Sequence, residues 1–237
     1  MNKRSVFYLS STQTILTALQ EGYGVSLYIR GQETDRIQTL KEYALQADVE
    51  IKYLDNELAY KHKARNILLA AAAPKSVNLL SWLRNVPDSV QVVILDRIQD
   101  PYNVGAIVRS AVFFSFDLVI LSQKQSAKVS NAVIYASSGA AYHIPVMSVG
   151  NLLQTIHLLK QYQFCVYGTD VEGTPLQECR IDKRYAVIIG NEQSGIRSQV
   201  RQTCDSFLSI QATTRMTSLN ASVAAGIFFY ALHNKTI

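Results

Sequence analysis

The chain has 237 residues, of which 48% are hydrophobic and 17% are charged. This composition excludes a disordered chain and fits one or two globular domains, at roughly 100–200 residues per domain. The net charge of +5 favours an anionic partner such as nucleic acid, although many mildly basic proteins bind none. No apolar run approaches a membrane span, and the first residues lack the apolar core of a signal peptide, so we expect a cytoplasmic protein with no membrane partner.

Cysteine and histidine usage predicts neither a disulfide framework nor a metal site. The three cysteines, Cys165, Cys179 and Cys204, are odd in number and form no C-x-x-C pair. The four histidines show no metal-ligand spacing, and no H-E-x-x-H motif occurs. We therefore expect reduced thiols and a protein without a metal ion.

The first part of the chain alternates between helix and strand patterns. A capped helix that ends at a glycine is followed by a short strand, a second helix, an alternating strand and an apolar segment that ends at a proline. These elements are expected at residues 10–22, 25–30, 35–48, 49–55 and 65–74. Together they predict a small α/β domain over residues 1–74, followed by a connection with one short helix over residues 75–90.

The remainder, residues 91–237, begins with a continuous apolar strand at 91–96, of the kind that is buried in parallel sheets. Further strands are expected at residues 116–122, 141–148, 164–170, 185–190 and 206–211. Helical patterns separate most of these strands, at residues 103–114, 128–138, 151–162 and 218–233. This alternation predicts an α/β domain with a mostly parallel sheet.

Ligands in open α/β sheets bind beyond the carboxyl ends of the strands, where three loops carry unusual polar residues. The first loop opens a helix with Asn103 and Gly105. Asn103 is a potential helix cap, and Gly105 permits close approach of another backbone or a ligand. Arg109 follows about a turn and a half later on an otherwise apolar helix, where its guanidinium suits a phosphate or a carboxylate. A cap and a solvated arginine are the simpler alternative.

The second loop follows a buried strand at Gly190 and contains Glu192 and Gly195. A simple turn would also explain these residues. The two glycines have the spacing of a P-loop, but Ile196 stands where its lysine would be, so ATP binding by that device is excluded. The motifs G-x-G-x-x-G and G-x-S-x-G do not occur, so neither a dinucleotide fold nor a common serine hydrolase is supported.

The third loop contains Ser218, Leu219 and Asn220, at the start of a helix that is apolar on nearly every face. Serine and asparagine are ordinary N-caps, because their side-chain oxygens accept the first free backbone N–H groups. The residues by themselves leave open whether this loop is a cap or part of a site.

Taken together, the three loops resemble the signature motifs of the SpoU/TrmH family of RNA ribose 2′-O-methyltransferases, in the SPOUT superfamily. The segments DPYNVGAIVRSA, IIGNEQSGI and SLNASVAAGI look like its first, second and third motifs. The resemblance covers about residues 91–235, and the motifs occur in the family's order. Gln211 stands where the family often has a proline, which concerns the shape of the third loop more than the activity.

The resemblance implies that residues 91–237 form a SPOUT catalytic domain, an α/β fold with a deep trefoil knot. It implies S-adenosyl-L-methionine as the methyl donor, held mostly by backbone groups of Gly190, Ile210 and Leu219, with Thr169 lining the same pocket. Residues 1–74 resemble, in layout, the small ribosomal-protein-like RNA-binding domain of the 23S rRNA guanosine 2′-O-methyltransferase branch.

The resemblance also implies roles for five site residues. Arg109 would act on the ribose 2′-hydroxyl, and we favour an electrostatic and orienting role, because arginine stays protonated in proteins. Asn103 would orient Arg109 or the ribose. The remaining residues would arrange the pocket by hydrogen bonds, and they are Glu192, Ser218 and Asn220.

The partners that the resemblance implies are RNA and a second copy of the chain. The apolar C-terminal helix suits a homodimer interface, although burial within one chain would explain it equally well. The extra N-terminal domain favours 23S rRNA over tRNA. Two alternatives remain: the same reaction on tRNA, and a non-catalytic knotted RNA-binding protein that assists ribosome assembly. The full set of motif residues argues against the second, since binding alone would not require them all.

Overall fold

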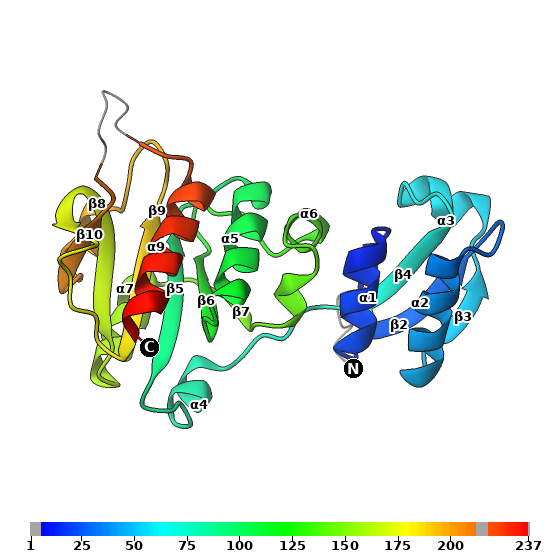
Figure 1. The fold of residues 1–237 in the computed structure, drawn as a ribbon, viewed down its shortest axis with the longest axis horizontal. Helices are drawn as coiled ribbons and strands as arrows, with labels where there is room; N and C mark the ends of the chain where they lie inside the picture. The colour runs from blue at the N-terminus through cyan, green and yellow to red at the C-terminus, as the bar shows by residue number, and fades with distance from the viewer. Residues whose placement is uncertain (1–5, 212–217, 237) are drawn as a thin grey trace.

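The chain folds as two β-sheets that are built from separate stretches of the sequence (Figure 1). The computed structural model describes residues 6–211 and 218–236. The smaller sheet uses residues 6–72, and the larger sheet uses residues 90–209. The short helix α4 (Leu79–Leu83) lies between them in the sequence. This separation supports the domain division expected from the sequence, which remains a proposal.

The smaller sheet, within residues 6–72, has four strands in the order β1-β4-β2-β3. Strands β2 and β3 run parallel, and the other pairs are antiparallel. Helices α1 and α2 pack on one face with Leu69 and Ala71, whereas Leu68 points to the other face beside Ala59 of α3. The elements are β1 (Val6–Leu9), α1 (Thr12–Gln20), β2 (Gly24–Ile29), α2 (Asp35–Gln46), β3 (Glu50–Tyr53), α3 (Asn56–Lys61) and β4 (Ile67–Ala72).

The larger sheet, within residues 90–209, has six strands in the order β10-β8-β9-β5-β6-β7, and its neighbouring strands run parallel. This arrangement confirms the predicted parallel α/β fold. The elements of this part are β5 (Val90–Asp96), α5 (Pro101–Phe113), β6 (Leu118–Ser122), α6 (Asn131–Ala136), η1 (Ala140–Tyr142), β7 (Val146–Val149), α7 (Leu152–Gln161), β8 (Cys165–Pro175), β9 (Arg184–Gly190), α8 (Ser198–Arg201), β10 (Ser206–Ser209) and α9 (Ala221–Thr236). Every helix in the described ranges is too short or too polar to cross a bilayer.

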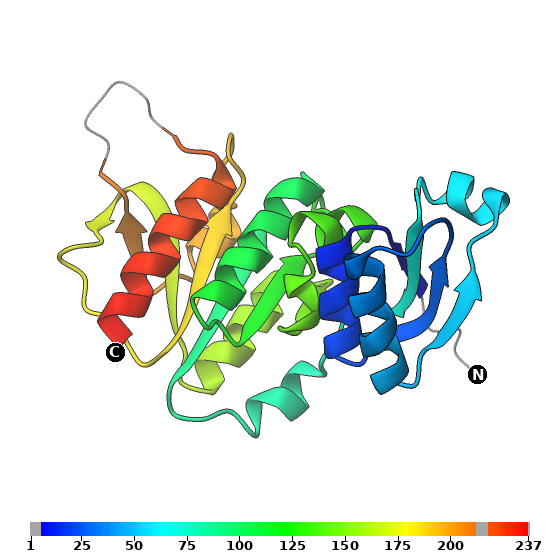
Figure 2. The same cartoon turned by 45° about the vertical axis from the view of Figure 1, so that its right-hand side comes forward.

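Helices cover both faces of the larger sheet, which explains why its strands are continuously apolar (Figure 2). Val93 and Leu95 of β5 face a core shared with α5, α6 and α9. Val92 and Ile94 face the opposite core, which is shared with α4, α7 and α8. The central strands are therefore dry on both sides, and polar chemistry is confined to the strand ends.

Strand β5 lies at the point where the strand order of the larger sheet reverses. Strands β6 and β7 lie on one side of β5, and strands β9, β8 and β10 lie on the other side. Asp96, the last residue of β5, is in register with Gly190, the last residue of β9. Ligands in open α/β sheets bind at such a reversal, so the carboxyl ends of β5 and β9 mark the expected site.

The strand that was expected over residues 141–148 begins later, as β7 from Val146. Residues before it form the 3₁₀ turn η1, which follows Gly139 with a left-handed φ of +87°. Pro145 lacks the N–H that a strand ladder uses, so regular pairing starts after it. Strand β1 and helices α3 and α8 are not predicted by the sequence pattern, because they are too short to show periodicity.

The two parts of the chain are joined by side-chain contacts as well as by the connecting segment. Glu21, at the end of α1, contacts His143 with 3.1 Å between Oε1 and Nδ1. The rings of Tyr23 and Tyr142 lie 4.7 Å apart. One apolar cluster also runs from α1 to α5. His143 is therefore part of the packed junction between the two parts.

The trefoil knot that the resemblance implies remains a prediction, because it involves residues 212–217, which lie outside the described residues. Strand β10 forms one edge of the larger sheet, whereas the following helix α9 packs on α5, nearer the centre.

Gly105 allows α5 and α6 to pack closely. A Cβ at this position would lie 2.5 Å from Ala136 Cβ and 2.7 Å from the Val133 carbonyl oxygen. We expect Gly105→Ala to lower the free energy of unfolding by about 1–3 kcal/mol, because overpacking outweighs the better helix propensity of alanine. Chemical denaturation measures this loss. Gly150→Ala is the control, because its Cβ would meet no atom closer than 3.5 Å, and equal losses in both variants would contradict the packing explanation.

Candidate active site

The three loops that the sequence singles out meet at the carboxyl ends of β5 and β9, where they line a polar cleft of about 560 Å³. Asn103, Glu192 and Asn220 are the predicted site residues among those that line it. Among the other lining residues, four lie within the first and second motif segments, two lie just before the first segment, and one lies on the loop after β6. These residues are Arg97, Gln99, Asp100, Gln125, Asn191, Gln193 and Ser194.

The side-chain amide of Asn103 links the other two loops. Its Nδ2 donates to Glu192 Oε1 at 2.6 Å, and its Oδ1 accepts from Asn220 Nδ2 at 3.0 Å. The partners lie 89 and 117 positions away in the sequence, so tertiary structure brings them together. The three predicted residues thus form one hydrogen-bonded series, while their roles in a reaction remain predictions.

Helix α5 begins at Pro101, two residues before the predicted start at 103, and Asp100 is its N-cap. Asp100 Oδ1 accepts the Tyr102 N–H at 2.9 Å, and Pro101 occupies the first position, where its missing N–H costs nothing. The expectation that Asn103 caps this helix is therefore wrong. Because Asp100 takes that role, the Asn103 amide is available for its two tertiary contacts.

Asn220 caps α9 and contacts the cleft with opposite ends of one amide. Its Oδ1 accepts from the backbone N–H groups of Ser222 at 2.9 Å and Val223 at 3.4 Å, while its Nδ2 reaches Asn103. Ser218 is exposed two residues before the cap. The third loop is therefore a helix cap and a wall of the cleft at once.

The loop after β9 is a tight turn held by its own polar groups. The backbones of Asn191 and Gly195 exchange two hydrogen bonds, at 3.2 and 2.8 Å. Asn191 Oδ1 also accepts two backbone N–H groups of the turn, both at 3.1 Å. A Cβ on Gly190 would lie 2.5 Å from the backbone of Gly195, so this position requires glycine. The turn presents Glu192 to Asn103.

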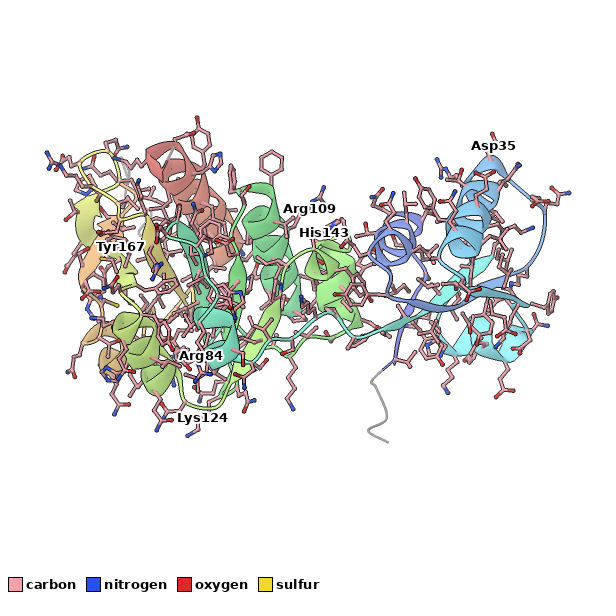
Figure 3. The ribbon with its side chains drawn as sticks, turned by 90° about the horizontal axis from the view of Figure 1, so that it is seen from below. Asp35, Arg84, Arg109, Lys124, His143 and Tyr167 are labelled. Atoms are coloured by element: carbon pink, nitrogen blue, oxygen red, sulfur yellow. The ribbon has the colours of Figure 1, made fainter. Side chains whose placement is uncertain are left out.

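Arg109 is not among the residues that line the cleft. Figure 3 marks its position on α5. It is exposed on α5, and its Nη1 donates to Ser138 Oγ at 3.1 Å. It lies six positions after Asn103, which is about one and two-thirds helical turns, so the two side chains leave α5 on different faces. Tyr102 and Phe113, which are 60% and 80% exposed, share the face of Arg109. The structure thus places Arg109 on a partly apolar surface outside the cleft.

The residues expected to hold the cofactor gather at the same edge of the sheet. Gly190 ends β9, Ile210 follows β10, and Thr169 of β8 donates its Oγ1 hydrogen to the Ile188 carbonyl at 2.9 Å. Ile210 is half-buried, and Leu219 is 45% exposed. None of these four residues is among those that line the cleft, so their role in holding the cofactor remains a prediction.

The described residues offer the cleft neither a reactive thiol nor a set of metal ligands. Burial raises the pKa of the Cys204 thiol to about 11. Burial also raises the pKa of Cys165 and of Cys179. These thiols stay protonated at neutral pH, so they are poor nucleophiles. No group of three or more His, Cys, Asp and Glu side chains in the described ranges is placed to hold a metal ion.

The larger sheet is parallel, and a polar cleft lies where its strand order reverses. This combination is typical of α/β proteins that bind a ligand at the carboxyl ends of their strands. Residues 91–230 match the SpoU rRNA methylase family. The chain therefore belongs to this family, and it is an RNA methyltransferase. The assignment from the three motifs is confirmed.

Proteins with similar sequences are also named as tRNA/rRNA methyltransferases. The chain is 39% identical over 156 residues to an uncharacterized tRNA/rRNA methyltransferase of Borreliella burgdorferi, which covers 65% of this chain and 68% of the relative. It is 30% identical over 226 residues to an uncharacterized tRNA/rRNA methyltransferase of Archaeoglobus fulgidus, which covers 94% of this chain and 97% of the relative.

The fold is similar to the crystal structure of the SpoU methyltransferase AviRb from Streptomyces viridochromogenes in complex with AdoMet. The TM-score is 0.83 at 21% sequence identity, and the similarity covers 97% of this chain and 90% of that one. This similarity confirms the predicted α/β fold with a mostly parallel sheet.

Replacing Asn220 with alanine removes a helix cap and a wall of the cleft together. We expect Asn220→Ala to lower the free energy of unfolding by about 1 kcal/mol and methyl transfer by about 100-fold, because the loops lose their alignment. Denaturation and a methyl-transfer assay measure the two effects.

Asn78→Ala is the matched control for Asn220→Ala. Asn78 Oδ1 caps α4 by accepting the Ser81 N–H at 3.1 Å, and α4 precedes β5 at the amino end of the sheet. The control should lose similar stability and keep its activity. Equal losses of activity in both variants would show that the Asn220 effect is only a capping effect.

Proposed function

We propose that the protein transfers a methyl group from S-adenosyl-L-methionine to a ribose 2′-hydroxyl of RNA, most favourably in 23S rRNA. The main structural support for this proposal is the hydrogen-bonded series of Glu192, Asn103 and Asn220, which joins the three family motifs at one cleft. The cofactor supplies an activated methyl group on sulfur. The AdoMet complex of AviRb, a protein of similar fold, supports this choice of cofactor.

We assign cofactor binding to Gly190, Ile210 and Leu219, with Thr169 lining the same pocket. Backbone groups of Gly190, Ile210 and Leu219 hold the cofactor by hydrogen bonds in this proposal. Backbone recognition tolerates side-chain changes, so Gln211 in place of the proline common in the family is compatible with binding.

The polar side chains of the cleft bind and orient the ribose in this proposal. A 2′-hydroxyl is a poor nucleophile, so it gains from fixed geometry and from an acceptor for its hydrogen. Glu192 Oε1 is bonded to Asn103, whereas Oε2 has only a long contact of 3.4 Å with Asn191 Nδ2 among the described contacts. Oε2 is therefore the carboxylate oxygen with capacity for a ribose hydroxyl, and Ser218 contributes its hydroxyl from the third loop.

Arg109 stabilises and orients the reacting hydroxyl in this proposal, although it does not line the cleft of its own chain. It shares an exposed face of α5 with Phe113, and the adjacent helix α9 exposes Val223, Ile227 and Tyr230 at helical spacing. Together these side chains form an apolar surface that suits a second copy of the chain. A homodimer packed through this surface would remove Arg109 from solvent and bring it to bound RNA.

A basic cavity on the N-terminal part supports the assignment of that part to RNA binding. The cavity has a volume of about 680 Å³ and lies on the face of the smaller sheet that α3 covers. Tyr60 is 89% exposed, so its ring is available to stack on an unpaired base, and nearby lysines can contact phosphates. The residues that line the cavity are Arg30, Asn56, Ala59, Tyr60, Lys61, Lys63 and Ala64.

Purified protein, labelled S-adenosylmethionine and RNA from cells that lack the protein test this function. Label should enter rRNA and map to a 2′-O-methylated ribose. Label confined to tRNA would establish the first alternative substrate. Failure of the protein to bind S-adenosylmethionine in calorimetry would favour the non-catalytic RNA-binding protein. A cytoplasmic location belongs to the same proposal.

Arg109→Ala should lower kcat for methyl transfer by about 100-fold or more, because the group that orients the hydroxyl is lost. Binding of S-adenosylmethionine should be unchanged. The control is Arg84→Ala, because Arg84 is an exposed arginine at the end of α4. Near-wild-type methylation of a true substrate by Arg109→Ala would refute the assigned role.

A double variant, Lys61→Ala with Lys63→Ala, tests the basic cavity. RNA affinity should fall, and the slope of log affinity against log salt should decrease by about 2, since each lost phosphate contact removes about one. The control is Arg36→Ala with Lys41→Ala on α2, which removes the same charge on the opposite face of the smaller sheet. Identical slopes for both double variants would contradict a specific role of the cavity.

A further inference from the structure

Asp96 is a buried carboxylate at the end of β5, beneath the loops of the cleft. Its side chain has no exposed surface, and it is the one charged residue that is buried among the described residues. A buried charge is costly unless it is paired and hydrogen-bonded, so the partners of Asp96 identify what it holds in place.

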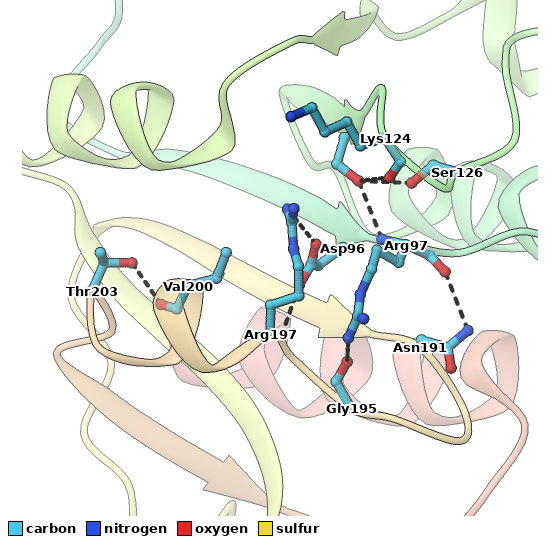
Figure 4. A network of polar contacts seen from close by, with 10 residues as sticks. Asp96, Arg97, Lys124, Ser126, Asn191, Gly195, Arg197, Val200 and Thr203 are labelled. Carbon is cyan, nitrogen blue, oxygen red and sulfur yellow. Dashed lines mark hydrogen bonds and ion pairs between the residues drawn. The ribbon is translucent and has the colours of Figure 1, made fainter.

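Both carboxylate oxygens of Asp96 contact Arg197 (Figure 4). Oδ2 accepts the backbone N–H of Arg197 at 3.0 Å, and Oδ1 lies 2.7 Å from Arg197 Nη2. Arg197 is the N-cap residue of α8 and lies two positions after Gly195, which ends the tight turn that carries Glu192. This double contact attaches the end of the turn to the central strand of the sheet.

Arg97, the next residue, attaches the rest of the same turn. Its carbonyl accepts from Asn191 Nδ2 at 3.2 Å, and its Nη2 donates to the Gly195 carbonyl at 3.3 Å. Arg97 has a φ of +62°, a left-handed conformation that costs energy for a residue with a side chain. Its N–H donates to Ser122 Oγ at 3.2 Å, which helps to hold this conformation.

We propose that Asp96 and Arg197 are positioning residues of the methyl-transfer site. Neither residue lines the cleft, so they act through the turn between them. The ion pair fixes the position of this turn relative to the end of β5. The turn places Glu192 against Asn103 and follows Gly190, the last residue of β9. The inference rests on the proposed function for what the turn binds, whereas the attachment of the turn is independent of it.

Asp205 offers a matched comparison within the same chain. It also combines a backbone donor with a cationic side chain, because it accepts the Val166 N–H at 2.8 Å and Lys160 Nζ at 2.6 Å. This pair lies at the amino end of β8, at the opposite edge of the sheet from the cleft. The loss of stability should be larger at the buried Asp96 than at the partly exposed Asp205, whereas an effect on the cleft is expected from Asp96 alone.

The test uses Asp96→Asn, Arg197→Met and Arg197→Lys in the full chain, with Asp205→Asn as the control. Calorimetry gives the dissociation constant of S-adenosylmethionine, and hydrogen exchange reports the protection of the amides at 190–197. We expect Asp96→Asn and Arg197→Met to raise the dissociation constant about tenfold or more and to speed exchange in this turn. Arg197→Lys, which keeps the charge, should recover part of the affinity, and Asp205→Asn should leave both readouts unchanged.

Unchanged affinity for S-adenosylmethionine in Asp96→Asn and Arg197→Met, measured below their melting temperatures, would overturn the proposal. A wild-type protein that binds no S-adenosylmethionine would instead refute the proposed function. Hydrogen exchange would then decide the positioning role by itself. Faster exchange confined to 190–197 would support it, and a uniform change over the whole sheet would overturn it.

Discussion

The register of β5 against β9 is the constraint on which the site depends. It sets Asp96 opposite Gly190, so the first and second motifs leave the sheet side by side although about 90 residues separate them. The third motif reaches the same place because α9 packs on α5, whose first turn carries Asn103. Both faces of the sheet are covered by helices, so this edge is where polar side chains meet without a cost of burial.

The larger sheet could be predicted from the sequence because its strands are continuous apolar runs bounded by loops. Asn103, Glu192 and Asn220, which cluster in the structure, were also predictable. Ligands bind beyond the carboxyl ends of parallel strands, and the three motifs lie on loops at those ends. The smaller sheet was harder to predict from the sequence. Strand β1 has four residues and α3 has six, so neither shows a period that distinguishes it from a loop. At Pro145, strand propensity was overridden by the missing donor.

Other features depend on tertiary contacts that no local pattern encodes. Asp100 and Asn103, three positions apart, are both good caps, and the sequence does not decide which one accepts the N–H groups of the first turn. The sequence pattern predicts only that Asp96 ends a strand, because its partner Arg197 lies 101 positions away. Arg109 belongs to the first motif, yet helical geometry turns it away from Asn103, which shows that membership in a motif does not imply membership in one cluster.

The series through Asn103 also has a direction. The side-chain oxygen of Asn220 accepts from a backbone N–H group in the first turn of α9. The side-chain nitrogen of Asn220 therefore donates to Asn103. Asn103 must then accept with its oxygen and donate with its nitrogen, and Glu192 can only accept while it is ionised. The orientation of both amides is therefore determined at the two ends, by a helix dipole and by a carboxylate. The series is a row of aligned dipoles rather than a set of interchangeable polar contacts, and its negative end is fixed at Glu192.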